Sequence, residues 1–138
     1  MKGLTNKRVF ITGAASGIGR STAERFYAEG AELILIDMPT LEQSELKALF
    51  PNKMTYISGD VTKAETLDAV RAEVNKGIDV LVNNAGITRD ATLLKMTDEQ
   101  WDQVIAVNLT AIFKLSKMAA EKMKAEGKGG SIIKQPQL

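Results

Sequence analysis

A short segment rich in glycine has the residue types to hold a phosphate group. It reads Thr12-Gly13-Ala14-Ala15-Ser16-Gly17-Ile18-Gly19 and lies between an apolar run and a stretch with helical spacing. Small residues let backbone amides approach a phosphate, and a helix N-terminus offers unpaired N–H groups and a partial positive charge. The spacing is neither Gly-x-Gly-x-x-Gly nor a P-loop, because no Gly-Lys-Ser or Gly-Lys-Thr follows. The segment predicts a phosphate-binding turn, with tight packing of three glycines as the alternative.

An acidic residue, Asp37, ends the second apolar run, 24 residues after Gly13. Near this place a dinucleotide-binding fold puts a carboxylate on the adenosine ribose hydroxyls. A carboxylate here also repels a 2′-phosphate, because two unit charges about 4 Å apart cost roughly 4 kcal/mol at a surface-like dielectric. Together with the glycine turn, Asp37 predicts a dinucleotide site that prefers NAD to NADP. Alone, Asp37 is more simply read as a loop acid that caps the next helix.

The residue types that the chain lacks narrow its chemistry. Its 138 residues include no Cys and no His, which excludes disulfides, thiolate or imidazole metal sites, and His general bases. Lys and Arg number 18 against 17 Asp and Glu, so the net charge gives no general field for nucleic acid or an anionic membrane. Neither a signal peptide nor a run of about 18 apolar residues occurs. We expect a cytoplasmic protein with no nucleic-acid or membrane partner.

Five short apolar runs alternate with longer helical stretches. The runs cover residues 9–12, 33–36, 54–58, 78–82 and 131–133. This alternation predicts an α/β fold, a doubly wound parallel sheet covered by helices. The second run is unbroken, which suits a strand buried on both faces. Because no linker or repeat occurs, residues 1–133 are expected to form one domain, with 134–138 as an atypical C-terminal tail.

Helix starts are marked three times by a capping box, in which a Thr oxygen accepts from the N3 amide and a Glu or Gln three residues on returns the bond. The boxes begin at Thr40, Thr62 and Thr97. After the third, an apolar stripe predicts one long helix to about residue 125, roughly 40 Å in length. The stripe consists of Trp101, Val104, Ile105, Ile112, Leu115 and Ala119.

Together these features resemble the short-chain dehydrogenase/reductase family. The glycine motif at 12–19, the pair Asp60-Val61 and the segment 83–86, which reads Asn-Asn-Ala-Gly, occur at family-like spacing across nearly the whole chain. Within the family, residues 85–90 and the helix after them are most similar to 3-oxoacyl-acyl carrier protein reductases, and related sugar and polyol dehydrogenases carry similar stretches. The resemblance implies a Rossmann-like sheet of strand order 3-2-1-4-5, and hydride transfer between NAD(H) and a carbonyl or alcohol such as a 3-oxoacyl thioester.

The resemblance also implies a set of cofactor-binding residues. From the pyrophosphate to the nicotinamide side, they are Gly13, Ser16, Gly17, Ile18 and Gly19 at the pyrophosphate, Asp37 at the ribose, Asp60 and Val61 at the adenine, and Asn83, Ala85 and Gly86 beside the nicotinamide. Asn83 closes the fourth run, at the carboxyl edge where ligands bind in open α/β sheets. For the segment 83–86, a turn that begins a loop is the alternative interpretation.

Asn108 is a candidate catalytic residue. It falls in phase with the apolar stripe, so its amide should face the interior, where a polar group needs partners. In the family, the matching Asn belongs to the catalytic tetrad, where it opens the helix backbone and holds a water in the proton relay. A structural Asn that locks the long helix against the sheet is an equally good interpretation.

The family's other catalytic residues have no counterpart here. In the family a Ser follows the fifth strand, and a Tyr-x-x-x-Lys motif lies on the next helix. In this chain Ala31 stands four residues after Tyr27, and Asp60 four residues after Tyr56. Pro136 interrupts the last apolar run soon after it begins. We therefore expect a truncated, NAD-binding portion that is inactive alone; a non-catalytic nucleotide-binding or protein-interaction module, or one part of a longer enzyme, are the alternatives.

A sheet that stops at its fifth strand leaves an exposed edge and uncovered apolar faces. Such surfaces invite pairing with other chains. In the family, the helix that matches the one at Trp101 packs in a dimer interface. We therefore expect self-association through the sheet edge and this helix.

Overall fold

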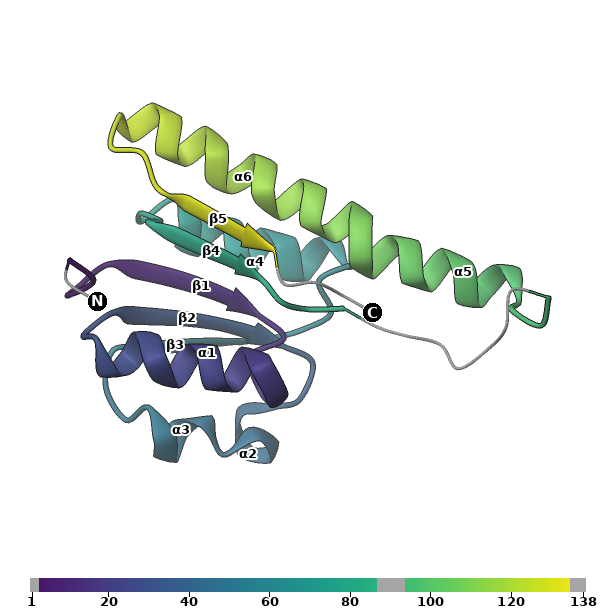
Figure 1. Ribbon diagram of the computed structural model, residues 1–138, viewed down its shortest axis with the longest axis horizontal. Helices are drawn as coiled ribbons and strands as arrows, with labels where there is room; N and C mark the ends of the chain where they lie inside the picture. The colour runs from purple at the N-terminus through teal and green to yellow at the C-terminus, as the bar shows by residue number, and fades with distance from the viewer. Residues whose placement is uncertain (1–2, 87–93, 135–138) are drawn as a thin grey trace.

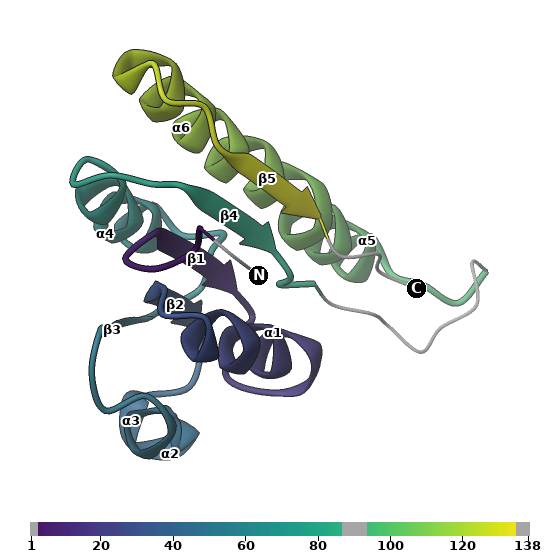
Figure 2. The same ribbon diagram turned by 60° about the vertical axis from the view of Figure 1, so that its left-hand side comes forward.

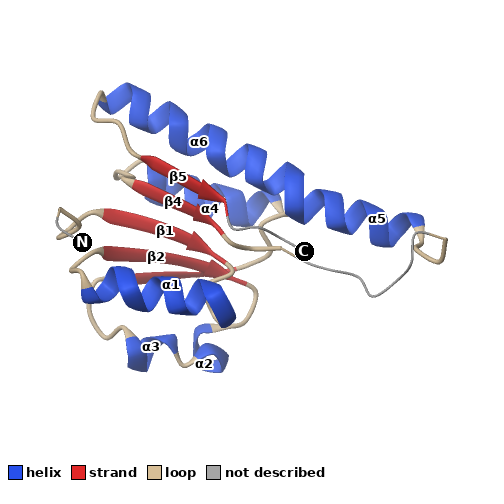
Figure 3. Ribbon diagram, viewed as in Figure 1, coloured by secondary structure: helices blue, strands red, loops and turns tan. Residues whose placement is uncertain are grey.

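A five-stranded parallel sheet forms the centre of the computed structural model, which describes residues 3–86 and 94–134. The strand order is β3-β2-β1-β4-β5, as Figure 1 and Figure 3 show. The strands are β1 (Arg8–Thr12), β2 (Glu32–Asp37), β3 (Met54–Ser58), β4 (Val80–Asn83) and β5 (Ser131–Lys134). The predicted α/β class and strand order are confirmed.

Helices cover both faces of this sheet (Figures 1 and 2). On one face lie α1 (Gly17–Ala28), α2 (Leu41–Ser44) and α3 (Leu46–Leu49), and on the other lie α4 (Ala64–Val74) and α6 (Ala111–Glu126). Successive β2 residues point to opposite faces, so Leu33 and Leu35 join the core beneath α1, and Ile34 and Ile36 join the core beneath α4 and α6. This two-sided burial explains the unbroken apolar run in the sequence.

Strand β5 lies at the edge of the sheet and pairs only with β4. All four of its residues are exposed, and Ile132 and Ile133 keep 42% and 41% of their surface accessible. The predicted end of the domain at residue 133 falls within this strand, and residues 135–138 of the predicted tail lie outside the described residues. Strand β5 is therefore an open apolar edge within the described part of the chain.

Two of the three predicted capping boxes are present. The side chains of Thr40 and Thr97 each accept a hydrogen bond from the backbone amide of the Gln at N3, and the side chain of that Gln accepts one from the backbone amide of the Thr. The box at Thr62 is wrong: α4 begins at Ala64 with Lys63 as its N-cap. The hydroxyl of Thr62 instead donates to Asp60 Oδ1 at 2.8 Å, because a carboxylate two residues earlier is a stronger acceptor and forms its own turn.

The predicted long helix is interrupted by one wide turn. It consists of α5 (Asp98–Ile105), a π-helical turn at Ala106–Thr110, and α6. Residues of α6 pack on the sheet, but α5 extends past the carboxyl ends of the strands (Figure 1) and contains no buried residue. Trp101 is consequently 53% exposed, so its predicted place in a buried stripe is wrong. No helix in residues 3–86 or 94–134 combines the length and apolarity needed to cross a bilayer.

Candidate functional site

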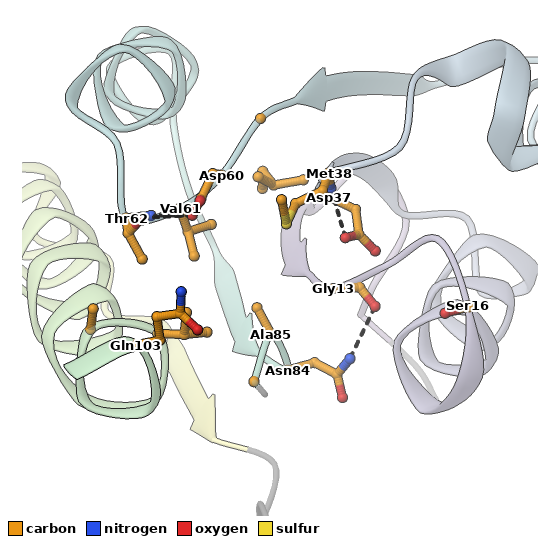
Figure 4. Close-up of a pocket in the computed structure, with 15 residues that line it drawn as sticks. Gly13, Ser16, Asp37, Met38, Asp60, Val61, Thr62, Asn84, Ala85 and Gln103 are labelled. Atoms are coloured by element: carbon orange, nitrogen blue, oxygen red, sulfur yellow. Dashed lines mark hydrogen bonds between the residues drawn. The ribbon is translucent and has the colours of Figure 1, made fainter. Parts of the chain in front are cut away.

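A cleft of about 530 Å³ lies at the carboxyl edge of the sheet. The ends of β1, β2, β3 and β4, helix α5 and the π-helical turn after it all contribute to it (Figure 4). Its lining includes the predicted cofactor residues Gly13, Ser16, Asp37, Asp60, Val61, Ala85 and Gly86. In an open parallel sheet, this edge is where the crossovers diverge and leave room for a ligand.

The three glycines of the turn differ in what surrounds them. A Cβ on Gly19 would overlap the carbonyl oxygen of Gly13, and a Cβ on Gly13 would lie 3.0 Å from the Cα of Ala85. Gly17 has a φ of +58°, and, apart from its chain neighbours and the backbone of its own helix, no described atom lies within 4 Å of the place where its Cβ would be. Close packing thus accounts for Gly13 and Gly19, whereas Gly17 faces open space.

The N-terminus of α1 has no side-chain cap within the described chain. Ser16 is the N-cap residue, but its side chain makes no capping hydrogen bond, and the first turn of α1 contains no acidic residue. The first amides of a helix need partners from outside it, and the helix dipole adds a partial positive charge there. Ser16 lines the cleft, and Gly17 and Ile18 line an adjoining hollow on α1. This helix end can bind an anion.

Asp37 joins the end of β2 to the glycine turn. Its Oδ2 accepts a hydrogen bond from the amide of Ala15 at 2.9 Å, and its Oδ1 accepts one from the amide of Met38 at 2.7 Å. A carboxylate has about four lone-pair directions, so Asp37 can accept further bonds from a diol. The two amides fix the carboxylate beside the uncapped end of α1.

Thr12 and Asn84 position the turn, and sequence reasoning assigned neither of them this task. The buried Thr12 hydroxyl accepts hydrogen bonds from the amides of Asn84 and Ala85, at 3.0 and 2.9 Å. The side-chain amide of Asn84 donates to the Gly13 carbonyl at 3.1 Å (Figure 4). These bonds hold the segment after β4 against the glycine turn. The sequence did offer one signal for Thr12, because it is a polar residue at the end of an apolar strand.

The other predicted residues lie at different depths around the cleft. Asp60 accepts from the amide and the hydroxyl of Thr62, which shapes the far wall beside Val61. Asn83 is buried and does not line the cleft; its Nδ2 donates to Ser116 Oγ at 3.2 Å, and its Oδ1 has no hydrogen-bond partner among the described residues. Asn83 is therefore placed to support the cleft floor.

Asn108 is half-buried within the π-helical turn. Its predecessors Ala106 and Val107 line the cleft, as does Gln103. Sequence reasoning missed these three residues and Met38, because none of them belongs to a motif that indicates a binding site. The wide turn opens the regular helical ladder at the wall of the cleft, as such turns often do at functional sites.

Comparison with known proteins agrees with the fold described above. A sequence profile described as short chain dehydrogenase matches residues 7–135. The chain belongs to the short-chain dehydrogenase family. Residues 87–90, part of the stretch on which the predicted likeness to 3-oxoacyl-acyl carrier protein reductases rests, lie outside the described residues.

Two curated relatives from this family show how far the likeness extends. An uncharacterized oxidoreductase of Mycobacterium bovis is 44% identical over 96% of this chain and 56% of its own length. The 3-oxoacyl-[acyl-carrier-protein] reductase of Thermotoga maritima is 40% identical over 94% of this chain and 55% of its own. The chain thus spans about half the length of these relatives.

Solved structures of short-chain dehydrogenases match the fold equally well. L-sorbose reductase of Gluconobacter frateurii, solved with NADPH and L-sorbose, superimposes with a TM-score of 0.85, at 34% identity over 96% of this chain and 52% of its own. A short-chain dehydrogenase of Streptomyces avermitilis gives 0.85 at 31% identity, over 97% of this chain and 50% of its own. The sheet described above corresponds to the first half of these enzymes.

Proposed function

We propose that this chain is the NAD-binding portion of a short-chain oxidoreductase. The observation that carries the proposal is the juxtaposition of the uncapped N-terminus of α1 with the Asp37 carboxylate at one cleft. The helix end suits a pyrophosphate, and the carboxylate suits the two hydroxyls of a ribose. Asp60 and Val61, on the opposite wall, would enclose the adenine.

The choice of NAD over NADP rests on Asp37. Members of this family use either nicotinamide dinucleotide, and the relative from Gluconobacter frateurii was solved with NADPH. A carboxylate accepts hydrogen bonds from ribose hydroxyls but repels a 2′-phosphate. The Met38 amide, which could donate to that phosphate, is already bonded to Asp37 Oδ1. The proposed cofactor is therefore NAD.

The parent activity that we propose is hydride transfer between NAD(H) and a carbonyl or alcohol, such as a 3-oxoacyl thioester. The nicotinamide supplies the hydride in such a reaction. A proton must also move, and this chain lacks the Tyr-x-x-x-Lys motif for that task. Asn108 is the proposed remaining member of the catalytic tetrad, but an amide does not titrate and can only orient a partner. We therefore expect binding without turnover.

Calorimetric titration with NADH tests this proposal. We expect measurable binding to the 138-residue chain, together with negligible oxidation of NADH in the presence of a 3-oxoacyl thioester. AMP is expected to compete, because it carries the adenosine and one phosphate. Absence of both heat and a thermal shift at millimolar NADH would contradict the proposal.

As a second candidate, we propose that the chain is an interaction module that self-associates. Apolar side chains exposed on the described surface favour it: Trp101, Leu109 and Phe113 along the α5–α6 helix, and Ile132 and Ile133 on the open edge. Exposed edges and apolar patches are typical association surfaces. The two candidates are compatible, because the nucleotide cleft lies at the carboxyl edge of the sheet whereas β5 is a lateral edge.

A further inference from the structure

Two hydroxyls of the edge strand β3 hold the backbone that follows Asp37. Tyr56 Oη donates to the Pro39 carbonyl at 2.6 Å. Ser58 Oγ lies 3.1 Å from the same carbonyl and 3.3 Å from that of Met38, so its proton is shared between them. The segment that leaves β2 is thereby tied back onto its neighbouring strand.

Strand register brings these groups together. Ser58 lies opposite Asp37 in the parallel β2–β3 pair, and Tyr56 lies opposite Leu35. Residues two apart in a strand share a face, so both hydroxyls come from the same side of β3. The contacts therefore depend on a Tyr-x-Ser pattern at the end of the edge strand. Neither of these two hydroxyls takes part in the other contacts described for the cleft.

The backbone N–H groups of this segment also donate hydrogen bonds to side chains of the chain itself. Asp37 Oδ1 accepts from the Met38 amide, and Gln43 Oε1 accepts from the Thr40 amide at 2.9 Å. Pro39, between them, has no N–H. Within residues 38–40, the backbone therefore has no uncommitted N–H for a phosphate, which needs donors.

We propose that Tyr56 and Ser58 are specificity-positioning residues that hold the 38–39 backbone so that the cleft admits a ribose diol and excludes a 2′-phosphate. This inference rests on the proposed NAD site. If these ties are removed, the 38–39 backbone can turn, the Met38 amide can leave Asp37, and a phosphate gains a donor. The discrimination is thus a property of the fixed segment as well as of the Asp37 charge.

The Tyr56 hydroxyl remains protonated, and so remains a hydrogen-bond donor, over the whole physiological pH range. Burial, together with the negative charge of Asp37, raises the pKa of Tyr56 to about 12. The hydroxyl consequently keeps its proton and its bond to Pro39 at neutral pH.

The test compares the dissociation constants of NADH and NADPH for the wild-type chain, Tyr56→Phe, Ser58→Ala and the double variant. We expect the preference for NADH over NADPH to fall by about fivefold in each single variant, the factor that corresponds to one ordinary hydrogen bond. Ser58→Thr keeps a hydroxyl and should restore the preference. Thermal melting checks that each variant is folded; Ser58 is exposed, so Ser58→Ala offers a test that does not disturb the core.

Tyr27→Phe is the matched control. It removes the other Tyr hydroxyl of the chain, which accepts a hydrogen bond from the Asn52 amide at 3.3 Å, away from the 38–39 segment. A purely structural role for Tyr56 and Ser58 would change both dissociation constants by the same factor. An unchanged preference in the variants, or an equal fall in Tyr27→Phe, would overturn the inference and leave the NAD site standing. Failure of the wild-type chain to bind NADH would overturn both.

Discussion

Asp37 is the residue on which the choice of cofactor depends most directly. Asp37→Asn preserves the size of the side chain but removes the charge that suits the ribose diol and repels a 2′-phosphate. We predict that NADH binds about tenfold more weakly, because a charge-assisted hydrogen bond becomes a neutral one, and that the preference over NADPH narrows. Titration of both cofactors measures this. Asp68→Asn, on the exposed face of α4, is the control, and an unaltered preference would remove Asp37 from this role.

Gly19 is required for packing. Because a Cβ at this position meets the backbone of Gly13 and the side chain of Asn84, we predict that Gly19→Ala lowers the free energy of unfolding by about 3 kcal/mol, a cost typical of overpacking. Gly127→Ala places a Cβ in open space at a φ of +68° and should cost only about 1 kcal/mol of left-handed strain. Urea denaturation compares the two, and equal costs would refute the packing role.

Features that a sequence motif with fixed spacing encodes were predictable, and hydrogen bonds that no motif encodes were not. The glycine turn and Asp37 could be identified from spacing. The hydrogen bonds that Asn84 donates to the Thr12 hydroxyl and the Gly13 carbonyl join residues more than 70 positions apart, and no local pattern encodes them. The box at Thr62 failed for the opposite reason: a local competitor, Asp60, took the hydroxyl.

Arg8 connects three elements at the amino edge of the sheet. From the start of β1, its guanidinium donates to the carboxylates of Glu32 on β2, at 2.6 Å, and Glu73 on α4, at 3.0 Å. It also donates to the carbonyls of Glu73 and Gly77. Partial burial opposes ionisation of Glu73, but hydrogen bonds from Lys76 and Arg8 outweigh it, so the pKa of Glu73 lies below its ordinary value.

We predict that Arg8→Ala lowers the free energy of unfolding by about 2–3 kcal/mol, because two carboxylates and two carbonyls each lose a donor in a half-buried site. Arg8→Lys should recover only part of this stability, since an ammonium group cannot reproduce the planar set of donors of a guanidinium. Arg25→Ala removes an ion pair whose Arg side chain is 66% exposed and should cost about 0.5 kcal/mol or less. Chemical denaturation of the three variants measures the differences; similar values for Arg8→Ala and Arg25→Ala would contradict the prediction.

The strands were predicted well from the sequence, but the point at which the long helix leaves the sheet was not. Hydrophobic runs located all five strands to within two residues, and the run at 54–58 matches β3. Periodicity also indicated the long helix, but it carries no information on where the sheet beneath that helix ends. Trp101 fits the apolar phase and is nevertheless exposed on α5, and the π-helical turn shifts the phase at Asn108.

The whole molecule exposes apolar surface on its open edge and along its longest helix. We predict that the chain forms dimers or larger assemblies at micromolar concentration, measurable by size-exclusion chromatography with light scattering. Ile133→Glu on β5 and Phe113→Glu on α6 each introduce a charge on one of these surfaces, and the variant that lowers the mass identifies the surface used. Lys117→Glu, on the exposed face of α6, is the control for charge alone. A monodisperse wild-type monomer would disprove self-association.

The bond between Asn84 and the Gly13 carbonyl also has a consequence for biosynthesis. It closes a loop of about seventy residues, so both walls of the cleft come together only when β4 has paired with β1. If the proposed dinucleotide binds in this cleft, a nascent chain can retain it only after the residues near 84 have left the ribosome. Ligand in the surrounding solution would then add to the stability of the folded form by mass action.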